Sequence, residues 1–474
     1  MRSLLTVLVL ATAAIAQSER YELGARLKQF EAAWDEVPEN TARQRALKVL
    51  PDVTMQFFSL QFGKAGKTLD EARFALKSET APSDAVRWAT ALFPDVQKRV
   101  MTDAKGGCKV RIRAFYDPKA KPKGLSISIR LGDGEAVTAA VDKVPFDVEV
   151  PRPKLAKVND RWDGDLVTTI EVDGKVLVER RIGVSIVPDA EFAAKSILAD
   201  AKALKHPPSL ELDSLKLRAE RVIAVAKGTV PENDVRLGRD LGEAEELLAS
   251  LKAKKPYFDL ARSGDLWLGV PTGTGDKATS TACRLFVPKK LDAKSPVPLV
   301  VAMHGAGGSE NLFFEGYGAG HIVKLCEKRG WLLVAPNSGL GFGLSAPVPV
   351  GDIVDNLAER YPIDPKRIFI VGHSMGAANT IAAIQVEPKR FAAASALGGG
   401  GTIRKPEAFA ELPLFIGIGD GDFALKKAQA LESALKKAGA KNVVYKEFAN
   451  VEHLVIVREA LDDVFALFDK LAKK

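Results

Sequence analysis

The sequence is poor in cysteine, and its few cysteines are not arranged as metal or redox sites. Cys108, Cys283 and Cys326 are the only ones among 474 residues, and they lie far apart. None belongs to a CxxC pair or another spacing typical of metal or redox sites. An odd number leaves at least one thiol free, and the sequence does not tell whether the other two pair. We expect buried structural thiols, and we expect no metal and no cofactor because clustered Asp or His ligands are also missing.

The sequence also lacks a long apolar run. No stretch reaches the roughly 20 apolar residues of a membrane-spanning helix, which predicts no membrane span. Residues 1–16 have the pattern of a secretory signal peptide: Arg2 is the charged end, residues 4–15 are apolar, and an Ala-x-Ala cleavage motif ends at Ala16. The mature chain would begin at Gln17. This pattern predicts an exported protein, either periplasmic or extracellular.

A basic block with interleaved aromatic residues is missing as well. The formal net charge is +8, but the 68 basic and 60 acidic residues are interspersed along the chain. Nucleic-acid-binding proteins concentrate their positive charge in a patch or stripe. We therefore predict a mixed-charge surface and no nucleic-acid partner.

What the sequence does contain is a change of pattern along the chain. Residues 17–104 show apolar residues at helical spacing, and residues 105–188 contain short alternating strands, as in a small antiparallel β-sandwich. Residues 189–257 return to helical spacing as a connector. Residues 258–474 alternate strands with helices, which predicts a doubly wound α/β domain with a mostly parallel sheet. The expected fold class is thus multidomain, with the α/β domain at the C-terminal end.

One stretch in the α/β domain has the pattern of a nucleophile elbow. The apolar residues 368–371 lead into Gly372-His373-Ser374-Met375-Gly376, and a run of small residues suited to a helix follows. In such a turn the serine hydroxyl leaves the sheet edge, and flanking glycines allow the strand and the helix to pack closely. Ser374 is therefore the candidate nucleophile, with Gly372 and Gly376 as the elbow glycines. An ordinary strand-to-helix turn with an accidental serine is the alternative.

A serine nucleophile needs a base and an orienting acid, which follow it along the chain in this fold. Of the five histidines, only His453 lies after Ser374, so it is the candidate base. The acid should follow a strand between them, and residues 414–418 are such a strand. Both Asp420 and Asp422 lie in the loop after it. We favour Asp422 because it has room to reach back to the imidazole, while Asp420 remains open.

The oxyanion of a tetrahedral intermediate needs preset N–H donors. One is expected at Met375, directly after the nucleophile, and the second in the loop after an earlier strand. Residues 304–308, which read His-Gly-Ala-Gly-Gly and follow the apolar run 299–303, are that loop. Ala306 is the first choice for the second donor and Gly307 the next, although a glycine-rich turn without function has the same pattern.

Several of these segments together resemble the α/β-hydrolases, and within them the secreted esterases of the polyhydroxybutyrate depolymerase and feruloyl-esterase-like group. The resemblance rests on residues 304–308, 361–368 and 372–376, on Gly419-x-x-Asp422 and on His453. It covers roughly residues 265–474. The chain departs from the group at Ala377, where another glycine is frequent, and in lacking a proline after the aspartate. The resemblance implies a serine esterase without cofactor or metal.

These observations predict a secreted serine hydrolase that cleaves carboxylic esters through an acyl-enzyme. Its substrate would be a small-molecule or polymeric ester, such as a carbohydrate ester or a polyester. Residues 339–350 are aperiodic and follow a predicted strand, so they are expected to face the substrate, although an inert connection has the same pattern. Two alternatives remain. One is a peptidase of the prolyl-oligopeptidase type, which would need a β-propeller. The other is an exported, non-catalytic binding protein with a relic hydrolase domain.

Overall fold

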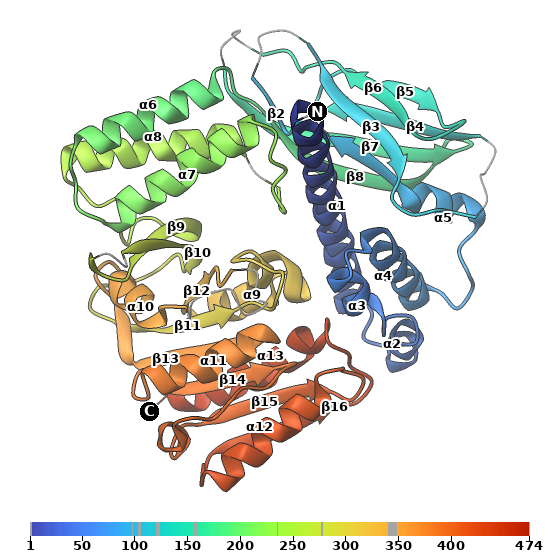
Figure 1. Cartoon of the computed structure of the whole chain (residues 1–474). Helices are drawn as coiled ribbons and strands as arrows, with labels where there is room; N and C mark the ends of the chain where they lie inside the picture. Colours follow the sequence, from blue (N-terminus) through green and yellow to red (C-terminus); the bar gives the residue numbers. More distant parts are fainter. Residues whose placement is uncertain are drawn as a thin grey trace. The chain divides into compact units, whose positions relative to one another are not determined.

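The computed structural model divides into two compact units, each built from separate stretches of the chain (Figure 1). The described residues are 2–96, 98–102, 106–119, 124–155, 160–234, 236–275, 278–339 and 348–473, with side chains from residue 17 onward. Unit 1 comprises Met1–Phe30, Asp52–His206 and Leu215–Lys252, and unit 2 comprises Glu31–Pro51, Pro207–Ser214 and Ala253–Lys474. The units are discontinuous along the chain, and the consecutive domain boundaries expected from the sequence stay a prediction.

Helices form most of the described chain before residue 92 and between residues 190 and 253. α1 (Arg2–Glu36) includes the expected signal peptide and continues beyond its cleavage point, and the signal peptide stays a prediction. The other helices are α2 (Asn40–Leu47), α3 (Val53–Phe58), α4 (Phe62–Lys77), α5 (Asp84–Ala91), α6 (Ala190–Ala203), α7 (Leu210–Ala226) and α8 (Leu237–Ala253). Among the described residues, no helix is long and apolar enough to cross a membrane.

Unit 1 contains two β-sheets. The first has the order β1 (Leu92–Val96), β3 (Cys108–Ala114) and β6 (Phe146–Val150). The second has the order β2 (Val100–Met101), β8 (Lys175–Ile186), β7 (Trp162–Val172), β4 (Leu125–Leu131) and β5 (Val137–Ala140). Neighbouring strands are antiparallel except for β2 and β8. The alternating burial of β4 shows that one face of its sheet is turned inward.

β1 and β2 lie within the segment that was expected to be helical. All five residues of β1 are buried, and the strand pairs with β3 from Leu92 opposite Ala114 to Val96 opposite Val110. A strand buried on both faces lacks the alternation by which a half-buried strand is recognised. The helical prediction for residues 92–96 is therefore wrong, because burial there removes the periodic signal.

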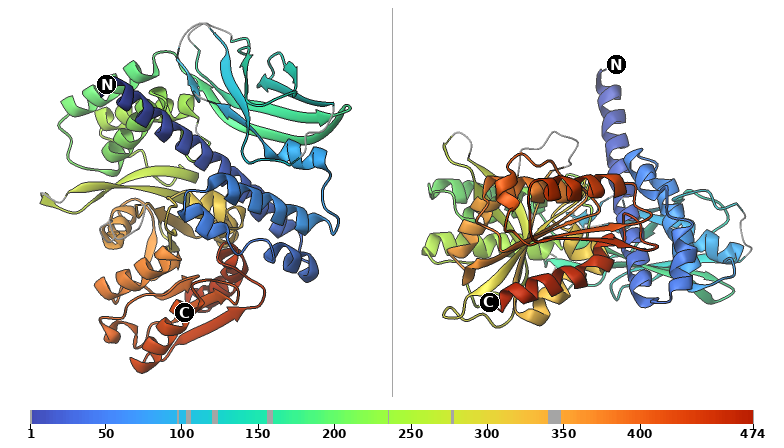
Figure 2. Two further views of the ribbon diagram at one scale, coloured as in Figure 1. Left: turned by 45° about the vertical axis from the view of Figure 1, so that its right-hand side comes forward. Right: turned by 90° about the horizontal axis from the view of Figure 1, so that it is seen from below.

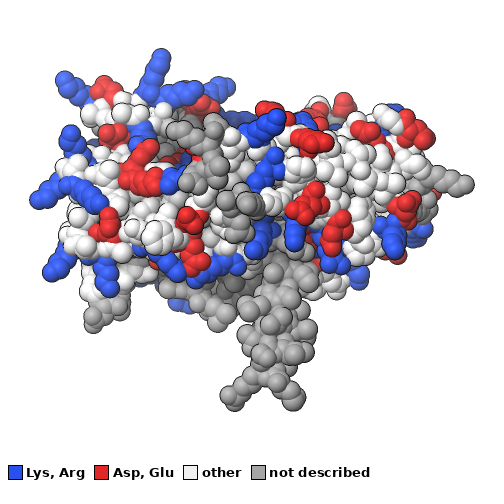
Figure 3. All heavy atoms as spheres, turned by 90° about the horizontal axis from the view of Figure 1, so that it is seen from above, with Lys and Arg blue, Asp and Glu red and all other residues white. Residues whose placement is uncertain are grey.

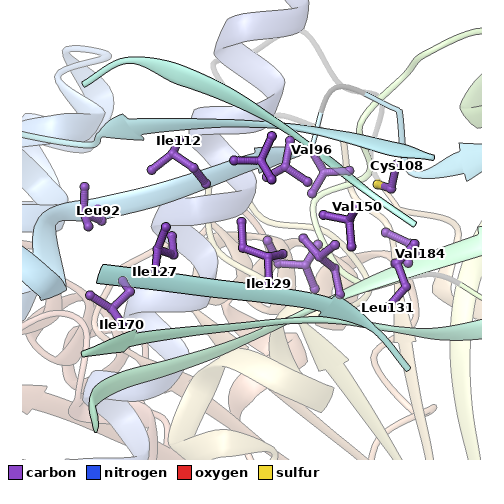
Figure 4. Packing of buried hydrophobic residues seen from close by; sticks show 14 of the residues in the cluster. Leu92, Val96, Cys108, Ile112, Ile127, Ile129, Leu131, Val150, Ile170 and Val184 are labelled. Carbon is purple, nitrogen blue, oxygen red and sulfur yellow. The ribbon is translucent and has the colours of Figure 1, made fainter. Parts of the chain in front are cut away.

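Aliphatic side chains from both sheets share the core of unit 1 (Figure 4). Leu92, Ile112 and Val150 come from the first sheet, and Ile129 and Val184 come from the second. Figure 4 shows these side chains pointing toward one another between the strands. These contacts between apolar side chains are typical of a packing region.

Unit 2 is organised around one eight-stranded sheet. Its order is β16 (Val443–Phe448), β15 (Leu414–Gly419), β14 (Ala393–Leu397), β13 (Ile363–His373), β11 (Val297–Met303), β12 (Leu332–Pro336), β10 (Thr279–Val287) and β9 (Gly264–Thr272). The strands from β16 to β12 are parallel, and β10 and β9 are antiparallel to their neighbours. β9 is an edge strand whose Gly269 and Pro271 are unusual inside strands, so no strand is predicted there from the sequence.

Helices lie on both faces of this sheet (Figure 2). They are α9 (His321–Arg329), α10 (Val350–Ala358), α11 (Met375–Val386), α12 (Leu425–Lys437) and α13 (Ile456–Ala472). Aromatic rings pack α13 to the sheet: Phe369 of β13 stacks on Phe468 with ring centroids 4.5 Å apart, and Trp331 stacks on Phe465 at 5.8 Å. The carboxyl ends of the parallel strands meet at one sheet edge, where ligands bind in open α/β folds.

Two composition-based expectations have structural counterparts. Cys108, Cys283 and Cys326 are all buried and free, and burial raises the pKa of the Cys108 thiol to about 11. On the face seen in Figure 3, basic and acidic side chains are interspersed. This mixing gives no support to nucleic-acid binding on that face.

Candidate active site

Ser374 lies in the corner between β13 and α11. β13 ends at His373, and α11 begins at Met375. Ser374 has φ 57° and ψ −114°, a conformation that costs energy for any residue other than glycine. Its N–H donates a hydrogen bond to the carbonyl of Leu397 on β14 at 2.8 Å. The half-buried serine is thus held at the carboxyl end of the central strands, beside the positive end of a helix.

The two elbow glycines lie where a side chain has no room. A Cβ on Gly372 would collide with the carbonyl of Gly376 and the hydroxyl of Thr380. A Cβ on Gly376 would collide with the carbonyls of Met303 and His304, at the end of β11. Glycine at both positions therefore lets the helix lie directly against the strands, as the pattern predicts.

His453 connects the serine to an aspartate. It lies in the loop between β16 and α13, and its Nε2 is 3.1 Å from the Oγ of Ser374. Its Nδ1 is 3.0 Å from both carboxylate oxygens of Asp422, in the loop after β15. Both His453 and Asp422 are 4% exposed, so water hardly competes for these contacts. The three side chains are aligned as a nucleophile, a base and an orienting acid require.

Asp420, the alternative acid, faces a different partner. Its carboxylate accepts a hydrogen bond from the N–H of Asn450 at 2.9 Å, at an exposed position. Asn450 has φ 59°, so this bond belongs to a tight turn before His453. Asp422, which also accepts the N–H of Ala424 at 2.7 Å, is therefore the aspartate beside the imidazole.

The glycine-rich loop after β11 lies next to the serine. A Cβ placed on Gly305 would be 3.3 Å from the Cβ of Ser374. Ala306 and Gly307 follow and are half-buried, and Gly307 has φ 75°, which favours glycine. Met375, the other expected donor, is half-buried at the start of α11. The structure thus places Gly305 of the loop beside Ser374 and Met375 directly after it, and the oxyanion donors stay a prediction.

His304, the first residue of this loop, is 1% exposed and is hydrogen-bonded at both ring nitrogens. Its Nε2 accepts the N–H of Ser338 at 2.9 Å, so its Nδ1 carries the proton and donates to the carbonyl of Gly305 at 2.8 Å. The imidazole of His304 is thereby neutral, and both of its ring nitrogens are hydrogen-bonded. Its role is to fix the peptide that leads to Ala306.

Two further buried residues contact the site and are not found from the sequence. Tyr317 donates its hydroxyl to the Nδ1 of His373 at 2.6 Å, and His373 directly precedes the serine. Burial lowers the pKa of His373 well below its ordinary value, with the nearby His453 adding to the effect, so the ring is neutral. His373 was set aside as a base by its position in the chain, and no local pattern marks Tyr317.

Two buried carboxyl groups lie behind the base. Burial raises the pKa of Glu452, the residue before His453, to about 8, although main-chain N–H donors such as that of Leu454 at 2.7 Å oppose the shift. Burial likewise raises the pKa of Glu31, which belongs to α1, to about 8. Glu31 accepts the N–H of Gly318 at 3.0 Å. Both carboxyl groups are thus largely protonated near neutral pH.

Other expected features have no place in this description. Among the described residues, no group of three or more His, Cys, Asp or Glu side chains is arranged to hold a metal ion. The expected substrate-facing segment 339–350 lies mostly outside the described residues, since residues 340–347 are not described.

Comparison with known proteins gives partial matches to esterases. Acetylxylan esterase A of Talaromyces purpureogenus is 28% identical over 144 residues, which are 27% of this chain and 36% of that protein. Feruloyl esterase B of Talaromyces funiculosus is 27% identical over 139 residues, 26% of this chain and 38% of that protein. The chain resembles acetylxylan and feruloyl esterases. The resemblance to feruloyl-esterase-like hydrolases is thus confirmed over part of the chain, whereas that to polyhydroxybutyrate depolymerases stays a prediction.

The extent of these matches is limited. The chain spans between about a quarter and a half of the length of the curated relatives it matches. No family model matches the chain. Solved structures include a ferulic acid esterase, with a TM-score of 0.38 and 15% identity over 44% of this chain and 100% of that one. A thermostable esterase has a TM-score of 0.37 and 17% identity over 79% of this chain and 97% of the other. At these TM-scores the solved structures add nothing to the fold assignment.

Proposed function

We propose that this protein is a serine hydrolase that cleaves carboxylic esters. The observation that carries the proposal is His453, whose two ring nitrogens lie 3.1 Å from the Ser374 hydroxyl and 3.0 Å from the Asp422 carboxylate. A serine hydroxyl is a weak nucleophile until a base removes its proton. An isolated pair of these residues could arise by chance. Acyl transfer needs a nucleophile, a base and an orienting acid in contact, and Ser374, His453 and Asp422 have this arrangement.

The reaction proceeds in two halves. His453 Nε2 takes the proton of Ser374 while Oγ attacks the ester carbonyl, and Asp422 holds the Nδ1–H tautomer and stabilises the imidazolium. The tetrahedral intermediate collapses as His453 passes this proton to the departing alcohol, which leaves an acyl-enzyme. His453 then takes a proton from a water molecule, which attacks the carbonyl of the acyl-enzyme. Hydrolysis of the acyl-enzyme releases the carboxylic acid, and the proton returns to Ser374.

The negative charge on the substrate oxygen is stabilised by main-chain N–H groups. Met375 supplies one, at the first position of α11, where the helix dipole adds positive potential. Ala306 supplies the second, with Gly307 as the alternative. The hydrogen bond from His304 to the carbonyl of Gly305 supports this assignment because it fixes the loop before the substrate binds.

The relatives support one substrate class. Proteins named acetylxylan esterase and feruloyl esterase are similar to this chain over 26–27% of its length. We infer that the substrate is an acetyl or feruloyl ester of a carbohydrate, and that simple esters and polyesters are weaker candidates. The predicted signal peptide supports a periplasmic or extracellular site of action, where such polymers are found.

The two alternatives receive less support. A prolyl-oligopeptidase-type peptidase would pair the hydrolase with a β-propeller, whereas the described strands of unit 1 form one three-stranded and one five-stranded sheet. A relic hydrolase would have no reason to keep Ser374 at φ 57° and a buried Asp422. Strained backbone of this kind is concentrated at functional sites, which favours a working hydrolase.

The test is the rate of hydrolysis of 4-nitrophenyl acetate by the protein and by its Ser374→Ala variant. We expect the variant to lose roughly 10⁶-fold in rate, down to the background, because the nucleophile is missing. Its melting temperature should stay near that of the parent, since alanine keeps the Cβ in the same backbone conformation.

Ser395→Ala is the matched control. Ser395 lies on the neighbouring strand β14, and its buried hydroxyl has no hydrogen-bond partner among the described residues. This variant should keep the parental rate. Parental activity in Ser374→Ala would refute the proposed nucleophile.

A further inference from the structure

A chain of hydrogen bonds runs beneath the nucleophile, from the oxyanion loop to the loop that carries the base. The N–H of Gly305 lies 3.2 Å from the hydroxyl oxygen of Tyr317, and this hydroxyl lies 2.6 Å from Nδ1 of His373. Nε2 of His373 lies 2.9 Å from the main-chain carbonyl of His453. The residues come from three separate stretches of unit 2, so the chain connects loops that are distant in sequence.

Each bond in this chain has one possible direction. The carbonyl of His453 can only accept, so Nε2 of His373 carries the proton. His373 is neutral, because burial lowers its pKa, and its Nδ1 therefore accepts the hydroxyl proton of Tyr317. The oxygen of Tyr317 in turn accepts the N–H of Gly305. Every donor and acceptor is used once, which leaves a single arrangement of lowest energy.

We propose that Tyr317 and His373 are positioning residues that set the distance between the oxyanion loop and His453. This inference rests on the proposed function. The two ends of the link lie at groups that take part in the reaction. Gly305 directly precedes the expected donor Ala306, and the carbonyl of His453 belongs to the base itself. Because His373 is the residue before Ser374, the link also passes through the elbow. The link thereby fixes the positions of the nucleophile, the base and the oxyanion donor relative to one another.

The packing around the link leaves little freedom. The ring centroid of Tyr317 lies 4.9 Å from that of Phe313 and 4.8 Å from that of His373, both in edge-on geometry. The rings of His373 and His453 are 4.6 Å apart. Gly398 lies over His373 so closely that a Cβ there would be 2.9 Å from the ring. Small displacements of the link would therefore be transmitted to the base.

The neighbouring residue of Tyr317 is anchored as well. The N–H of Gly318 donates to the carboxyl group of Glu31 at 3.0 Å, and both groups are buried. Glu31 belongs to the stretch Glu31–Pro51 that forms part of unit 2. The segment that carries Tyr317 is thus fixed on one side by the link and on the other by a distant part of the chain.

Neither Tyr317 nor His373 changes its protonation near neutral pH, because burial raises the pKa of Tyr317 and lowers that of His373. The link thus stays neutral. Its contribution is geometric. Displacement of a reacting group by about 1 Å can cost about 100-fold in rate.

The first experiment compares Tyr317→Phe with the parent protein on 4-nitrophenyl acetate. The reactive sites are first counted by titration with a fluorophosphonate, so that kcat refers to correctly folded sites. We expect kcat per titrated site to fall about 10- to 100-fold, with KM within about twofold. A purely structural tyrosine would lower the number of titrated sites or the melting temperature and leave kcat per site unchanged. That second result would overturn the inference.

Tyr361→Phe is the matched control. Tyr361 is also a buried tyrosine of unit 2, and its hydroxyl has no hydrogen-bond partner among the described residues. The same change of one oxygen atom should leave kcat per site at the parental value. A loss as large as that in Tyr317→Phe would also overturn the inference, because it would show a general effect of altering buried tyrosines.

A second variant keeps the test decisive if Tyr317→Phe fails to fold. His373→Gln retains an amide that can donate toward the carbonyl of His453 and breaks the bond from Tyr317. We expect the same loss in kcat per titrated site with little change in KM, and parental kcat would contradict the link. Ser374→Ala, run in parallel, separates the two proposals: if it stays active, the proposed function fails, whereas an inactive Ser374→Ala beside a fully active His373→Gln rejects only the link.

Discussion

Both units contain buried polar side chains, but the two networks are organised differently. In unit 1, Arg26 contacts Glu22 at 2.7 Å and Asp70 at closer range, and Arg180 contacts Glu22 at 2.8 Å. Arg26 and Arg180 also donate to the carbonyl of Thr90, at 3.0 and 2.8 Å. Asp70 also contacts Arg73 at 3.4 Å and accepts the hydroxyl proton of Tyr116 at 2.9 Å. These contacts hold the charged groups of unit 1 against one another and against the main chain, and we call this group the closed network.

The network of unit 2 is open at one end. The buried carboxylate of Asp422 faces His453, whose far nitrogen points to Ser374, and the serine is half-buried. Tyr317 and His373 extend the network inward through neutral groups. The carboxylate of Asp422 is thus connected through His453 to the hydroxyl of Ser374, which a substrate can reach. Burial of charge therefore does not by itself mark an active site, whereas a hydrogen-bonded connection from the buried charge to an accessible nucleophile does.

Asp422→Asn gives the largest effect expected from this comparison. The amide cannot hold the Nδ1–H tautomer of His453, so kcat on 4-nitrophenyl acetate should fall about 10⁴-fold. The melting temperature should change little, because the shape of the side chain is kept. A variant with more than about a tenth of the parental kcat would contradict the role of Asp422.

Asp70→Asn makes the same substitution in the closed network. Removing one carboxylate leaves Arg26 under-compensated in a buried position, which should lower the free energy of unfolding by about 3–5 kcal/mol. Urea denaturation measures this loss, and the kcat per fluorophosphonate-titrated site should equal that of the parent. A large fall in kcat per site would break the comparison, because it would make the closed network part of the catalytic machinery.

Glu31→Gln should change how stability depends on pH. The pKa of Glu31 rises from an ordinary 4.5 to about 8 by burial; Gly318 and Arg458 oppose the rise, and Glu452 and Glu459 add to it. Because the folded pKa is the higher one, the stability contributed by the neutral carboxyl is fully present below pH 4.5 and is lost as pH rises through 8.

The measurement is the melting temperature of parent and Glu31→Gln between pH 5 and 8. The parent should lose stability more steeply over this range, and the variant should keep only the dependence that Glu452 contributes. Glutamine retains an acceptor for the N–H of Gly318. Parallel curves for the two proteins would show that Glu31 does not titrate in this window.

Phe423→Ala should give the smallest effect, on substrate binding. Phe423 follows Asp422, its ring centroid lies 4.3 Å from that of His453, and it is 54% exposed. An exposed ring beside the base offers a flat apolar surface to a substrate ring. We expect KM for a feruloyl ester to rise roughly threefold to tenfold, with kcat nearly unchanged.

Val386→Ala is the control for Phe423. Val386 is another exposed apolar residue, 67% accessible at the end of α11. Its truncation should leave KM unchanged. Equal KM values for parent and Phe423→Ala would remove Phe423 from the substrate-binding surface.

The catalytic end of the open network can be predicted from the sequence, because its signals are local or ordered. The elbow is a five-residue pattern after an apolar strand, and only His453 follows Ser374 in the chain. The choice between Asp420 and Asp422 needs geometry, since both lie in the same loop. In the structure Asp422 faces the imidazole, whereas Asp420 accepts the N–H of Asn450.

The inner end of the network cannot be predicted in this way. Tyr317 and His373 are 56 residues apart, and Glu31 and Gly318 are 287 residues apart. These pairs meet only because β11 and β13 are neighbours in the sheet and because part of α1 belongs to unit 2. No periodicity or motif records such contacts. The same reason explains β1, whose five residues are buried by a partner strand and show no pattern of their own.

The most direct test is to find which residue reacts with an organophosphorus fluoride. The intact protein and a His453→Ala variant are treated with diisopropyl fluorophosphate, digested, and analysed by peptide mass spectrometry. We predict a single diisopropylphosphoryl serine, at Ser374, in the parent protein and a reaction slower by several orders of magnitude in the variant, because His453 activates the nucleophile. Modification of another residue, or equal labelling of Ser374 without His453, would contradict the central claim.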